Sequence, residues 1–224
     1  MTITFLENAG LYLQSQGCGL LVDAPNREKT LFDGIPQPVV DAMAAGEPPY
    51  DALCGMVFTH KHSDHYDKKR VRQLTDSRPN LTVFATNGAT PPTGELTIGC
   101  YTIRYFTVPH SGAEFAEEYH RTFLISDGID TIYVAGDSVW DKQYHLAILD
   151  GVKLTAAVWN PNFVSMAEGR ELLQLAQKNY VNHFPIQSEA MSGIGRKCKT
   201  SFTRYPDELQ TTTLVDALPL TVEI

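Results

Sequence analysis

Short apolar runs separated by turn residues dominate the pattern of hydrophobic and polar positions along this chain. Runs of about four to eight such residues are typical of strands, and Asn87-Gly88 and Asp127-Gly128 are typical of the turns between strands. The pattern predicts strands over residues 3–6, 10–14, 19–23, 53–58, 81–85, 101–108, 123–126, 131–135 and 155–159, and a closing strand between residues 211 and 224.

Fewer segments have helical spacing. Asp67 can cap a helix that continues through Val71 to about Leu74. Ser165 and Glu168 fit a capping box ahead of apolar residues at helical spacing, which predicts a helix over residues 166–178. Residues 24–50 contain five of the 13 prolines, so we expect an irregular connection or insertion there, with one short helix near residues 39–45.

The strands outnumber the helices and occur in runs, which is typical of sheets packed face to face with helices outside. The chain has 224 residues, of which 43% are hydrophobic and 20% charged, enough to bury a substantial core. One domain spanning residues 1–224, with the irregular connection at about 24–50, is the simplest organisation.

Composition also limits the classes of function. The formal net charge of -8 disfavours general nucleic-acid binding, because phosphate backbones are held largely by Lys and Arg. There is no apolar run of about 18 residues, and the N-terminus has no export-signal pattern, so we expect a cytoplasmic protein without a membrane partner. The four cysteines are far apart and are expected to be reduced, with neither a disulfide framework nor a thiolate zinc site: Cys18, Cys54, Cys100 and Cys198.

The densest polar cluster is THKHSDH, residues 59–65, directly after the predicted buried strand over residues 53–58. Side chains two positions apart in an extended segment point the same way, so His60 and His62 can bind one metal ion. The next residues can turn Asp64 and His65 toward a second ion beside the first. A surface loop that is polar by chance is the poorer explanation.

Three later residues of metal-binding type follow other apolar segments and can complete such a site. They are His110 in VPHSG, Asp137 in VAGDS and His183 in VNHFP. Because strand ends can converge on one edge of a sheet, we expect these side chains to meet the THKHSDH cluster. Asp23, in LLVD, is expected to accept a hydrogen bond from a ligand histidine or a loop amide.

Five motifs occur along most of the chain in this order: Asp23 in LLVD, the HKHSDH cluster, His110, Asp137 and His183. They resemble the five motifs of the metallo-β-lactamase fold superfamily. The resemblance implies an α+β fold, a four-layer αββα sandwich. It also implies that His60, His62 and His110 hold one ion, that Asp64, His65 and His183 hold a second, and that Asp137 bridges them. A water between the ions would be the nucleophile, since two metals roughly 3.5 to 4 Å apart lower its pKa toward about 7.

Within the superfamily, the short chain, the early Asp23 and the ending NHFP resemble the branch of ascorbate-phosphate lactonase and the phosphodiesterase-like hydrolases. Some relatives carry a Gly-His pair where this chain has Asn8-Ala9-Gly10. The histidine at position 62 favours two divalent ions, preferably Zn²⁺ with Mn²⁺ or Fe²⁺ as alternatives, because the diiron branch has glutamate there.

We therefore expect a metal-dependent hydrolase that cleaves a phosphodiester or a lactone in a small anionic substrate. Asp64 and Asp137 are the candidate catalytic residues, with Asp64 one of several candidates for the general acid. The alternative is a metal-binding sensor or small-molecule binding protein without turnover. A ribonuclease is disfavoured by the acidic balance.

Several residues near these motifs have two interpretations. The basic cluster Arg196, Lys197, Lys199 and Arg204 can clamp a substrate anion or form a solvated helix face, and the second is favoured. Lys61 and Ser63 can face the substrate or point away from the metals. His120 and His145 lack a motif and are expected to be hydrogen-bonded or surface histidines.

Overall fold

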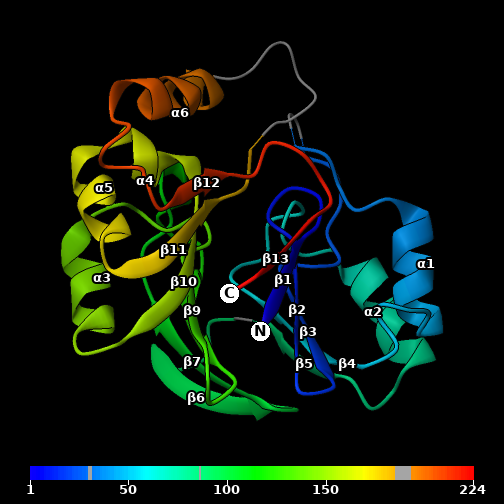
Figure 1. Cartoon of the computed structure of the whole chain (residues 1–224). Helices are drawn as coiled ribbons and strands as arrows, with labels where there is room; N and C mark the ends of the chain where they lie inside the picture. Colours follow the sequence, from blue (N-terminus) through cyan, green and yellow to red (C-terminus); the bar gives the residue numbers. More distant parts are fainter. Residues whose placement is uncertain (30–31, 86, 185–192) are drawn as a thin grey trace.

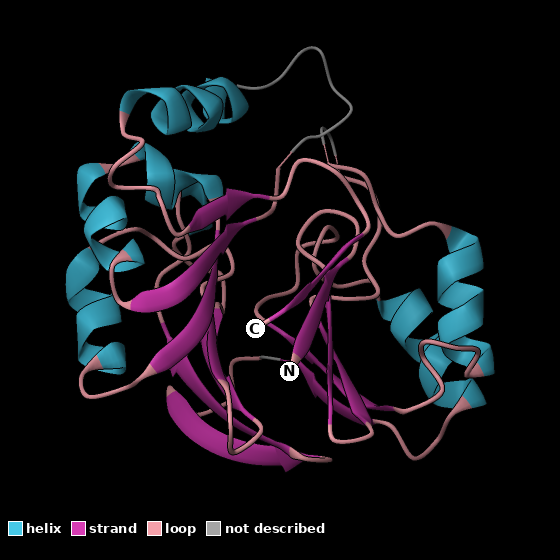
Figure 2. Cartoon of the chain, in the orientation of Figure 1, coloured by secondary structure: helices cyan, strands magenta, loops and turns pink. Residues whose placement is uncertain are grey.

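The computed structural model describes residues 1–29, 32–85, 87–184 and 193–224. Two sheets pack face to face, and helices cover the outer face of each sheet (Figures 1 and 2). The α+β fold class and the four-layer αββα sandwich are confirmed.

The first sheet joins the N-terminal strands to one strand from the C-terminus. Strands β13, β1, β2 and β3 pair in antiparallel fashion, whereas β3 with β4 and β4 with β5 are parallel. The order across the sheet is β13 (Leu220–Glu223), β1 (Thr2–Phe5), β2 (Leu11–Ser15), β3 (Cys18–Val22), β4 (Leu53–Phe58) and β5 (Thr82–Ala85). The C-terminal ends of β3 and β4 therefore lie side by side, and Asp23 N donates to Val57 O at 3.0 Å.

The second sheet changes from antiparallel to parallel at β9. Its order is β12 (Thr212–Leu214), β11 (Ala176–Val181), β10 (Leu154–Trp159), β9 (Thr131–Val134), β8 (Arg121–Ser126), β7 (Tyr101–Thr107) and β6 (Thr93–Ile98). Strands β9 to β12 are parallel, and β8 is antiparallel to both β7 and β9. It follows that β7, β9 and β11 run in one direction and end at the same edge.

Three apolar clusters hold these layers together. One lies between the sheets and contains Phe5, Ile103 and Tyr180. A second packs the outer face of the second sheet against α3 (Lys142–Leu149), α4 (Pro161–Ser165), α5 (Ala167–Leu173) and α6 (Gly193–Arg204), and a third packs the first sheet against α1 (Gln37–Ala45) and α2 (Lys68–Ser77). None of the described helices is long and apolar enough to cross a membrane.

Two local helix predictions are confirmed. The Asp67 carboxylate caps α2 by accepting hydrogen bonds from the backbone N–H groups of Lys69 and Arg70, both at 2.9 Å. Helix α1 is the short helix expected within residues 24–50.

The predicted helix over residues 166–178 is wrong in its second half. Helix α5 ends at Leu173, and residues 176–181 form β11 between β10 and β12. Ser165 Oγ donates to Pro161 O inside α4 and does not cap α5. Burial decides the outcome, because the Asn179 side chain is fully buried and accepts a hydrogen bond from Trp159 Nε1 at 2.8 Å.

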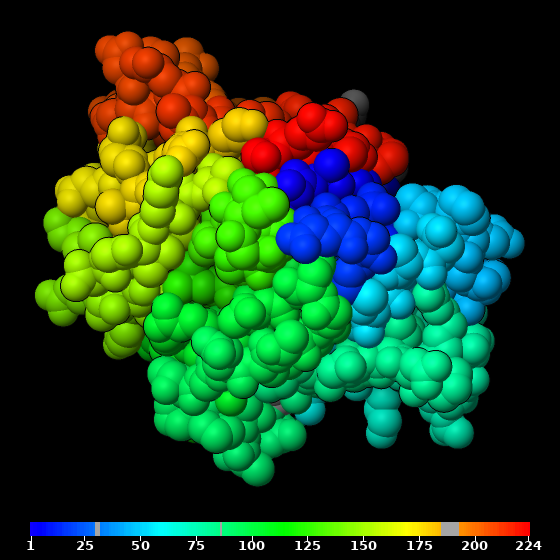
Figure 3. All heavy atoms as spheres, turned by 60° about the horizontal axis from the view of Figure 1, so that its bottom comes forward, coloured from blue at the N-terminus to red at the C-terminus, as the bar shows by residue number. Residues whose placement is uncertain are grey.

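The C-terminus forms two strands in different sheets, β12 and β13, instead of one closing strand. Strand β13 pairs with β1, and the blue N-terminal and red C-terminal residues are neighbours in Figure 3. Strand β6 and helix α3 were not predicted. Strand β6 is rich in Thr, Gly and Glu and has a half-exposed face, so it lacks the apolar run that marks the buried strands.

The expectation that all four cysteines are reduced is wrong for Cys18 and Cys54, which form a disulfide between β3 and β4. They are 36 positions apart in sequence, and the parallel pairing of the two strands brings their starts together. Spacing along the chain does not reveal this register. Cys100 and Cys198 are free, and Cys198 is buried.

Candidate metal centre

The predicted ligands follow the ends of four strands, one in the first sheet and three in the second. His60 follows β4, His110 follows β7, Asp137 follows β9 and His183 follows β11. Because β7, β9 and β11 run in one direction, the last three side chains reach the same edge of the second sheet. An isolated β-bridge between His110 and Ser138 joins two of these segments.

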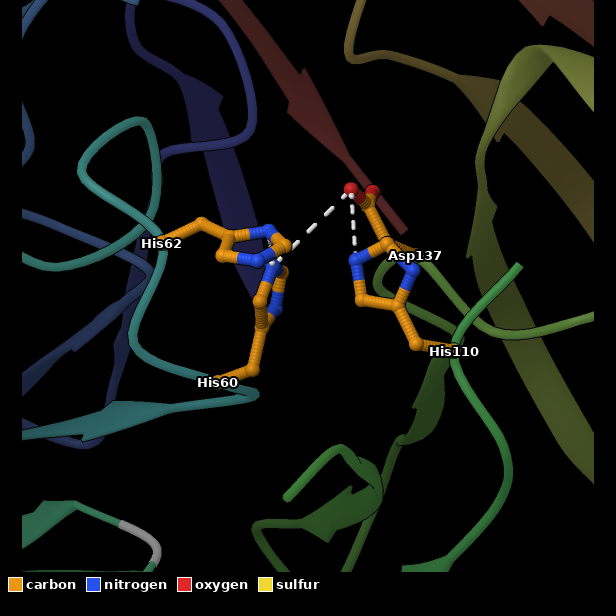
Figure 4. A group of neighbouring side chains, drawn as sticks. All are labelled: His60, His62, His110 and Asp137. Carbon is orange, nitrogen blue, oxygen red and sulfur yellow. Dashed lines mark hydrogen bonds and ion pairs between the residues drawn. The ribbon is translucent and has the colours of Figure 1, made fainter. Parts of the chain in front are cut away.

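The first group consists of His60, His62, His110 and Asp137, each of which offers one ligand atom within 4.8 Å of the others. His60 Nε2 and His62 Nδ1 are 3.0 Å apart. Asp137 Oδ2 lies 3.9 Å from His60 Nε2 and 3.5 Å from His110 Nε2. Figure 4 shows the two histidines after β4 on one side and His110 with Asp137 on the other, facing each other.

The second group consists of Asp64, His65 and His183, all buried or nearly so. A turn places the first two, since the backbone N–H groups of His65 and Tyr66 both donate to His62 O. His183 Nε2 lies 3.9 Å from Asp64 Oδ2. The turn expected after His62 is therefore present, and it brings Asp64 and His65 next to His183, with the His65 ring also in contact with that of His60.

Asp137 lies between the two groups. Its Oδ2 atom is 3.4 Å from His65 Nε2 and 3.2 Å from His183 Nε2, besides its two contacts in the first group. One carboxylate oxygen thus faces the Nε2 atoms of four histidines. This position is the one expected of a ligand that bridges two ions.

Oxygen acceptors hold four of the histidines in one orientation. His65 Nδ1 is 2.9 Å from Asp23 Oδ2, His110 Nδ1 is 2.6 Å from Ser111 O, and His60 Nδ1 is 3.0 Å from Thr59 Oγ1. The Nδ1 atom of His183 contacts Asn8 Oδ1. A proton on each Nδ1 leaves the Nε2 lone pair free for a metal, which is the usual arrangement around ligand histidines.

Asp23 makes both of the contacts that were predicted as alternatives, one with a histidine of the site and one with a loop amide. Besides its contact with His65, the Asp23 carboxylate accepts hydrogen bonds from Thr59 N at 2.7 Å and from Thr59 Oγ1 at 2.8 Å. Asp23 is 1% exposed and has a φ of 51°, so it is fixed at the end of β3 against the start of the THKHSDH segment.

The loop after β1 contributes to the site although it lacks the Gly-His pair of some relatives. Asn8 Oδ1 accepts from His183, and Asn8 Nδ2 donates to Asp64 O at 2.8 Å. Asn8 therefore joins two members of the second group that are far apart in the sequence. Both Asn8 and His183 have positive φ, at 58°.

Burial and charge favour the protonation states that metal binding needs at His60 and Asp137, whereas His65 is held toward its protonated form by two carboxylates. Burial lowers the pKa of His60 well below its ordinary value, so its imidazole is neutral. Burial alone would raise the pKa of Asp137, but His183 and His65 hold it well below the usual range and keep the carboxylate ionised. The neighbouring Asp137 and Asp23 carboxylates outweigh burial at His65 and raise its pKa.

The donor set fits divalent cations. Three buried polar atoms of the two groups have no hydrogen-bond partner in the described chain: His65 Nε2, His110 Nε2 and Asp137 Oδ1. Ligands about 2.0 to 2.1 Å from a tetrahedral zinc lie about 3.4 Å from one another. The separations of 3.2 to 3.9 Å around Asp137 Oδ2 are close to that value.

The two histidines left out of the ligand set are both buried and bonded. His120 Nδ1 is 3.0 Å from Val108 O, and burial lowers the pKa of His120 to about 3. Its ring packs 5.3 Å from that of His60, behind the first group. His145, on the buried face of α3, bonds to Tyr133 and Val139, outside the metal centre.

The basic cluster lies on the exposed face of α6: Arg196, Lys197, Lys199 and Arg204. This matches the favoured interpretation of a solvated helix face. Lys61 and Ser63 line an open groove together with Arg27, Tyr66 and Lys68, and no predicted ligand lines that groove.

Sequence reasoning missed four side chains at the centre. Phe32 stacks on His183 with ring centroids 4.2 Å apart, and Phe115 contacts the rings of His62 and His110. Lys29 Nζ is 3.2 Å from Asp64 Oδ1, and Glu118 Oε2 is 3.8 Å from His62 Nε2. These residues lie in irregular segments without a metal-binding pattern, so no sequence signal marks them.

Solved structures with the same architecture match the whole chain. A possible metal-dependent hydrolase from Veillonella parvula has a TM-score of 0.74 at 15% identity, and the metallo-β-lactamase fold protein YhfI from Bacillus subtilis has 0.64 at 14%; each match covers 100% of this chain and 99% of the other. This chain has the metallo-β-lactamase fold. An isothiocyanate hydrolase from Delia radicum gut bacteria has a TM-score of 0.67 at 18% identity, with the same coverage.

No model of a known protein family matches the chain, and no curated protein matches its sequence. At identities this low the matches establish the metallo-β-lactamase fold alone. The activity must therefore be argued from the metal centre.

Proposed function

We propose that this chain is a metal-dependent hydrolase with a dinuclear site that cleaves an ester-like bond, a phosphodiester or a lactone, in a small anionic molecule. The observation that carries the proposal is the position of Asp137. Its Oδ2 atom faces four histidine Nε2 atoms from two adjacent ligand groups, and three buried polar atoms of these groups, His65 Nε2, His110 Nε2 and Asp137 Oδ1, make no hydrogen bond among the described residues.

The two groups would divide the work of holding two ions. His60, His62 and His110 would hold one, Asp64, His65 and His183 would hold the other, and Asp137 would touch both. Divalent cations at these positions would activate water as a nucleophile and polarise the oxygen of the bond under attack. Zn²⁺ suits the imidazole-rich donor set, with Mn²⁺ or Fe²⁺ as alternatives.

The residues of the chain supply the orientation that this chemistry needs. Asp23, Asn8, Thr59 and the Ser111 carbonyl oxygen fix the rings of four histidines. Asp64, with one oxygen toward His183, is a candidate to accept or donate a proton at the second group. The fold neighbours favour hydrolysis, and the isothiocyanate hydrolase among them adds a third substrate class to the test.

The test begins with metal-free protein reloaded with zinc or manganese. The proposal predicts turnover of bis(4-nitrophenyl) phosphate or of a simple lactone. Asp137→Asn should lower kcat/KM by at least about 100-fold, because the amide removes the charge next to four histidines. Asp76→Asn, at an exposed position on α2, is the matched control and should retain full activity. Loss of activity in both variants, or none in either, would refute the proposed role of Asp137.

A metal-binding sensor without turnover is the competing function. It requires that the reloaded wild-type protein bind metal but hydrolyse none of the three substrate classes: phosphodiesters, lactones and isothiocyanates. It further requires that Asp64→Ala leave small-molecule binding largely intact. Hydrolysis by the wild-type protein that Asp64→Ala abolishes in a folded variant would exclude the sensor.

A further inference from the structure

Lys29 and Phe32, between β3 and α1, lie against the metal centre. The backbone N–H groups of Lys29 and Phe32 each donate to the carbonyl oxygen of the other, at 3.0 and 2.9 Å. This pairing directs both side chains to the second ligand group: the Phe32 ring stacks on His183, and Lys29 Nζ lies 3.2 Å from Asp64 Oδ1.

Lys29 also lies toward the first group. Its ammonium is 5.9 Å from the centroid of the Phe115 ring, which in turn is 4.8 Å from the ring of His62 and 4.7 Å from that of His110. The Lys29 side chain is 35% exposed, whereas that of Asp64 is 3% exposed. The ammonium is therefore at the boundary between the buried ligands and solvent.

The contact with Asp64 leaves donors of Lys29 unused. An ammonium carries three N–H donors, and Asp64 Oδ1 can accept from one of them, while Asp64 Oδ2 faces His183. No other acidic side chain among the described residues lies within ion-pair distance of Lys29. Lys29 is therefore a cation beside the metal centre that is paired with one carboxylate oxygen and has donors left for a second anion.

We propose that Lys29, beside Phe32 and Phe115, binds an anionic group of the substrate, a carboxylate or phosphate that is separate from the bond to be cleaved. This rests on the proposed hydrolase function and adds the substrate feature that the site reads. The aromatic rings favour a substrate whose anionic group is attached to an apolar or planar part, since they offer no hydrogen-bond donor.

The first experiment compares two esters that differ by one charge, 4-nitrophenyl acetate and the mono-4-nitrophenyl ester of glutaric acid. Lys29→Met retains the length of the side chain and removes its charge. We expect kcat/KM for the glutarate ester to fall about 10- to 100-fold, the usual effect of losing a charged hydrogen bond, and that for the acetate ester to change less than about 2-fold. Lys29→Arg should recover part of the loss.

Lys69→Met is the matched control, because Lys69 is an exposed lysine on α2 without an ion pair in the described chain. Metal content and melting temperature are measured for each variant. If Lys29→Met lowers the activity toward both esters equally, Lys29 acts through Asp64 and the proposal fails. Equal activity of wild type and Lys29→Met toward the glutarate ester also overturns it.

The second experiment separates this proposal from the proposed function. Calorimetry measures the binding of glutarate to the metal-loaded wild-type protein and to Lys29→Met, without any turnover. We expect Kd to rise at least about 10-fold in the variant at unchanged metal content. If the wild-type protein hydrolyses no ester, the function fails, yet a change in Kd still supports the role of Lys29, and an unchanged Kd refutes it.

Discussion

Asp23 Oδ2 lies 2.9 Å from Nδ1 of His65, although 42 positions separate the two residues in the sequence. The parallel pairing of β3 and β4 makes this contact, since it places the ends of both strands side by side. The same carboxylate holds Thr59, whose hydroxyl is 3.0 Å from Nδ1 of His60. One buried aspartate thus orients a ligand histidine in each of the two groups.

Replacing Asp23 with Asn should weaken metal binding more than it weakens the fold. The amide nitrogen cannot accept a hydrogen bond, so Thr59 or His65 loses its acceptor. We expect the affinity for zinc to fall about 10- to 100-fold, as for other partners of ligand histidines. Competition with a chromophoric chelator measures the affinity. An unchanged affinity would show that Asp23 does not position His65.

Asn8 offers a second test of orientation, at His183. Because Asn8 has a φ of 58°, which favours glycine, Asn8→Gly removes the side chain without adding backbone strain. We expect at least about a 10-fold loss of zinc affinity at the second group, with little change at the first. The matched control is Gln16→Gly, also at positive φ but on a turn remote from the ligands. Similar losses in both variants would contradict the role of Asn8.

Gly136, next to Asp137, should tolerate no side chain. A Cβ there would lie 2.7 Å from His120 Nε2 and 2.9 Å from Thr59 Cγ2, whereas a Cβ at Gly128 would meet nothing within 4 Å. Both glycines have positive φ, so the two alanine variants share the backbone penalty. We expect Gly136→Ala to be less stable than Gly128→Ala by about 1 to 3 kcal/mol, measured by urea unfolding. Equal stabilities would mean that the neighbours of Gly136 relax freely.

His145 should make the stability depend on pH. Burial lowers the pKa of His145 to about 4, and its ring is 2.7 Å from both the Tyr133 hydroxyl and Val139 O. An unfolded histidine titrates near about 6.5, so the unfolded state binds more protons between about pH 6.5 and 4. The free energy of unfolding should therefore fall as the pH is lowered through this range.

His145→Gln removes this proton and should flatten the dependence on pH. The difference between wild type and variant should change by up to about 3 kcal/mol between pH 7 and pH 4. The measurement is urea unfolding of the metal-free proteins, in which loss of metal cannot contribute. Parallel curves for the two proteins would contradict the assignment of a neutral buried His145.

The cluster of candidate ligands could be predicted from sequence because local pattern and chemistry coincide in THKHSDH, where the residue types that bind metals follow a buried strand. Strand β4 has the predicted bounds for the same reason, since an apolar run on a buried parallel strand is a local signal. His110 and Asp137 follow segments of the same kind. These residues converge because the strands before them run in the same direction, as expected from strand ends that meet at one edge of a sheet.

What could not be predicted depends on contacts between distant segments. The apolar residues just before residue 176 have helical spacing, which led to the prediction that the helix continues. Residues 176–181 form a strand because they pair with β10 on one side and β12 on the other. The Cys18–Cys54 pair depends on the register of β3 against β4. Lys29 and Phe32 lie in a proline-rich connection without periodicity, and their role follows from where that connection folds.

Zinc stoichiometry measured by native mass spectrometry, after titration of metal-free protein, tests the two-ion centre most directly. We predict two ions per chain for the wild type and one for His183→Ala, which leaves the His60, His62 and His110 group intact. His145→Gln, outside both groups, should retain two. A wild-type protein that binds no zinc, or no more than one ion, would contradict the dinuclear centre.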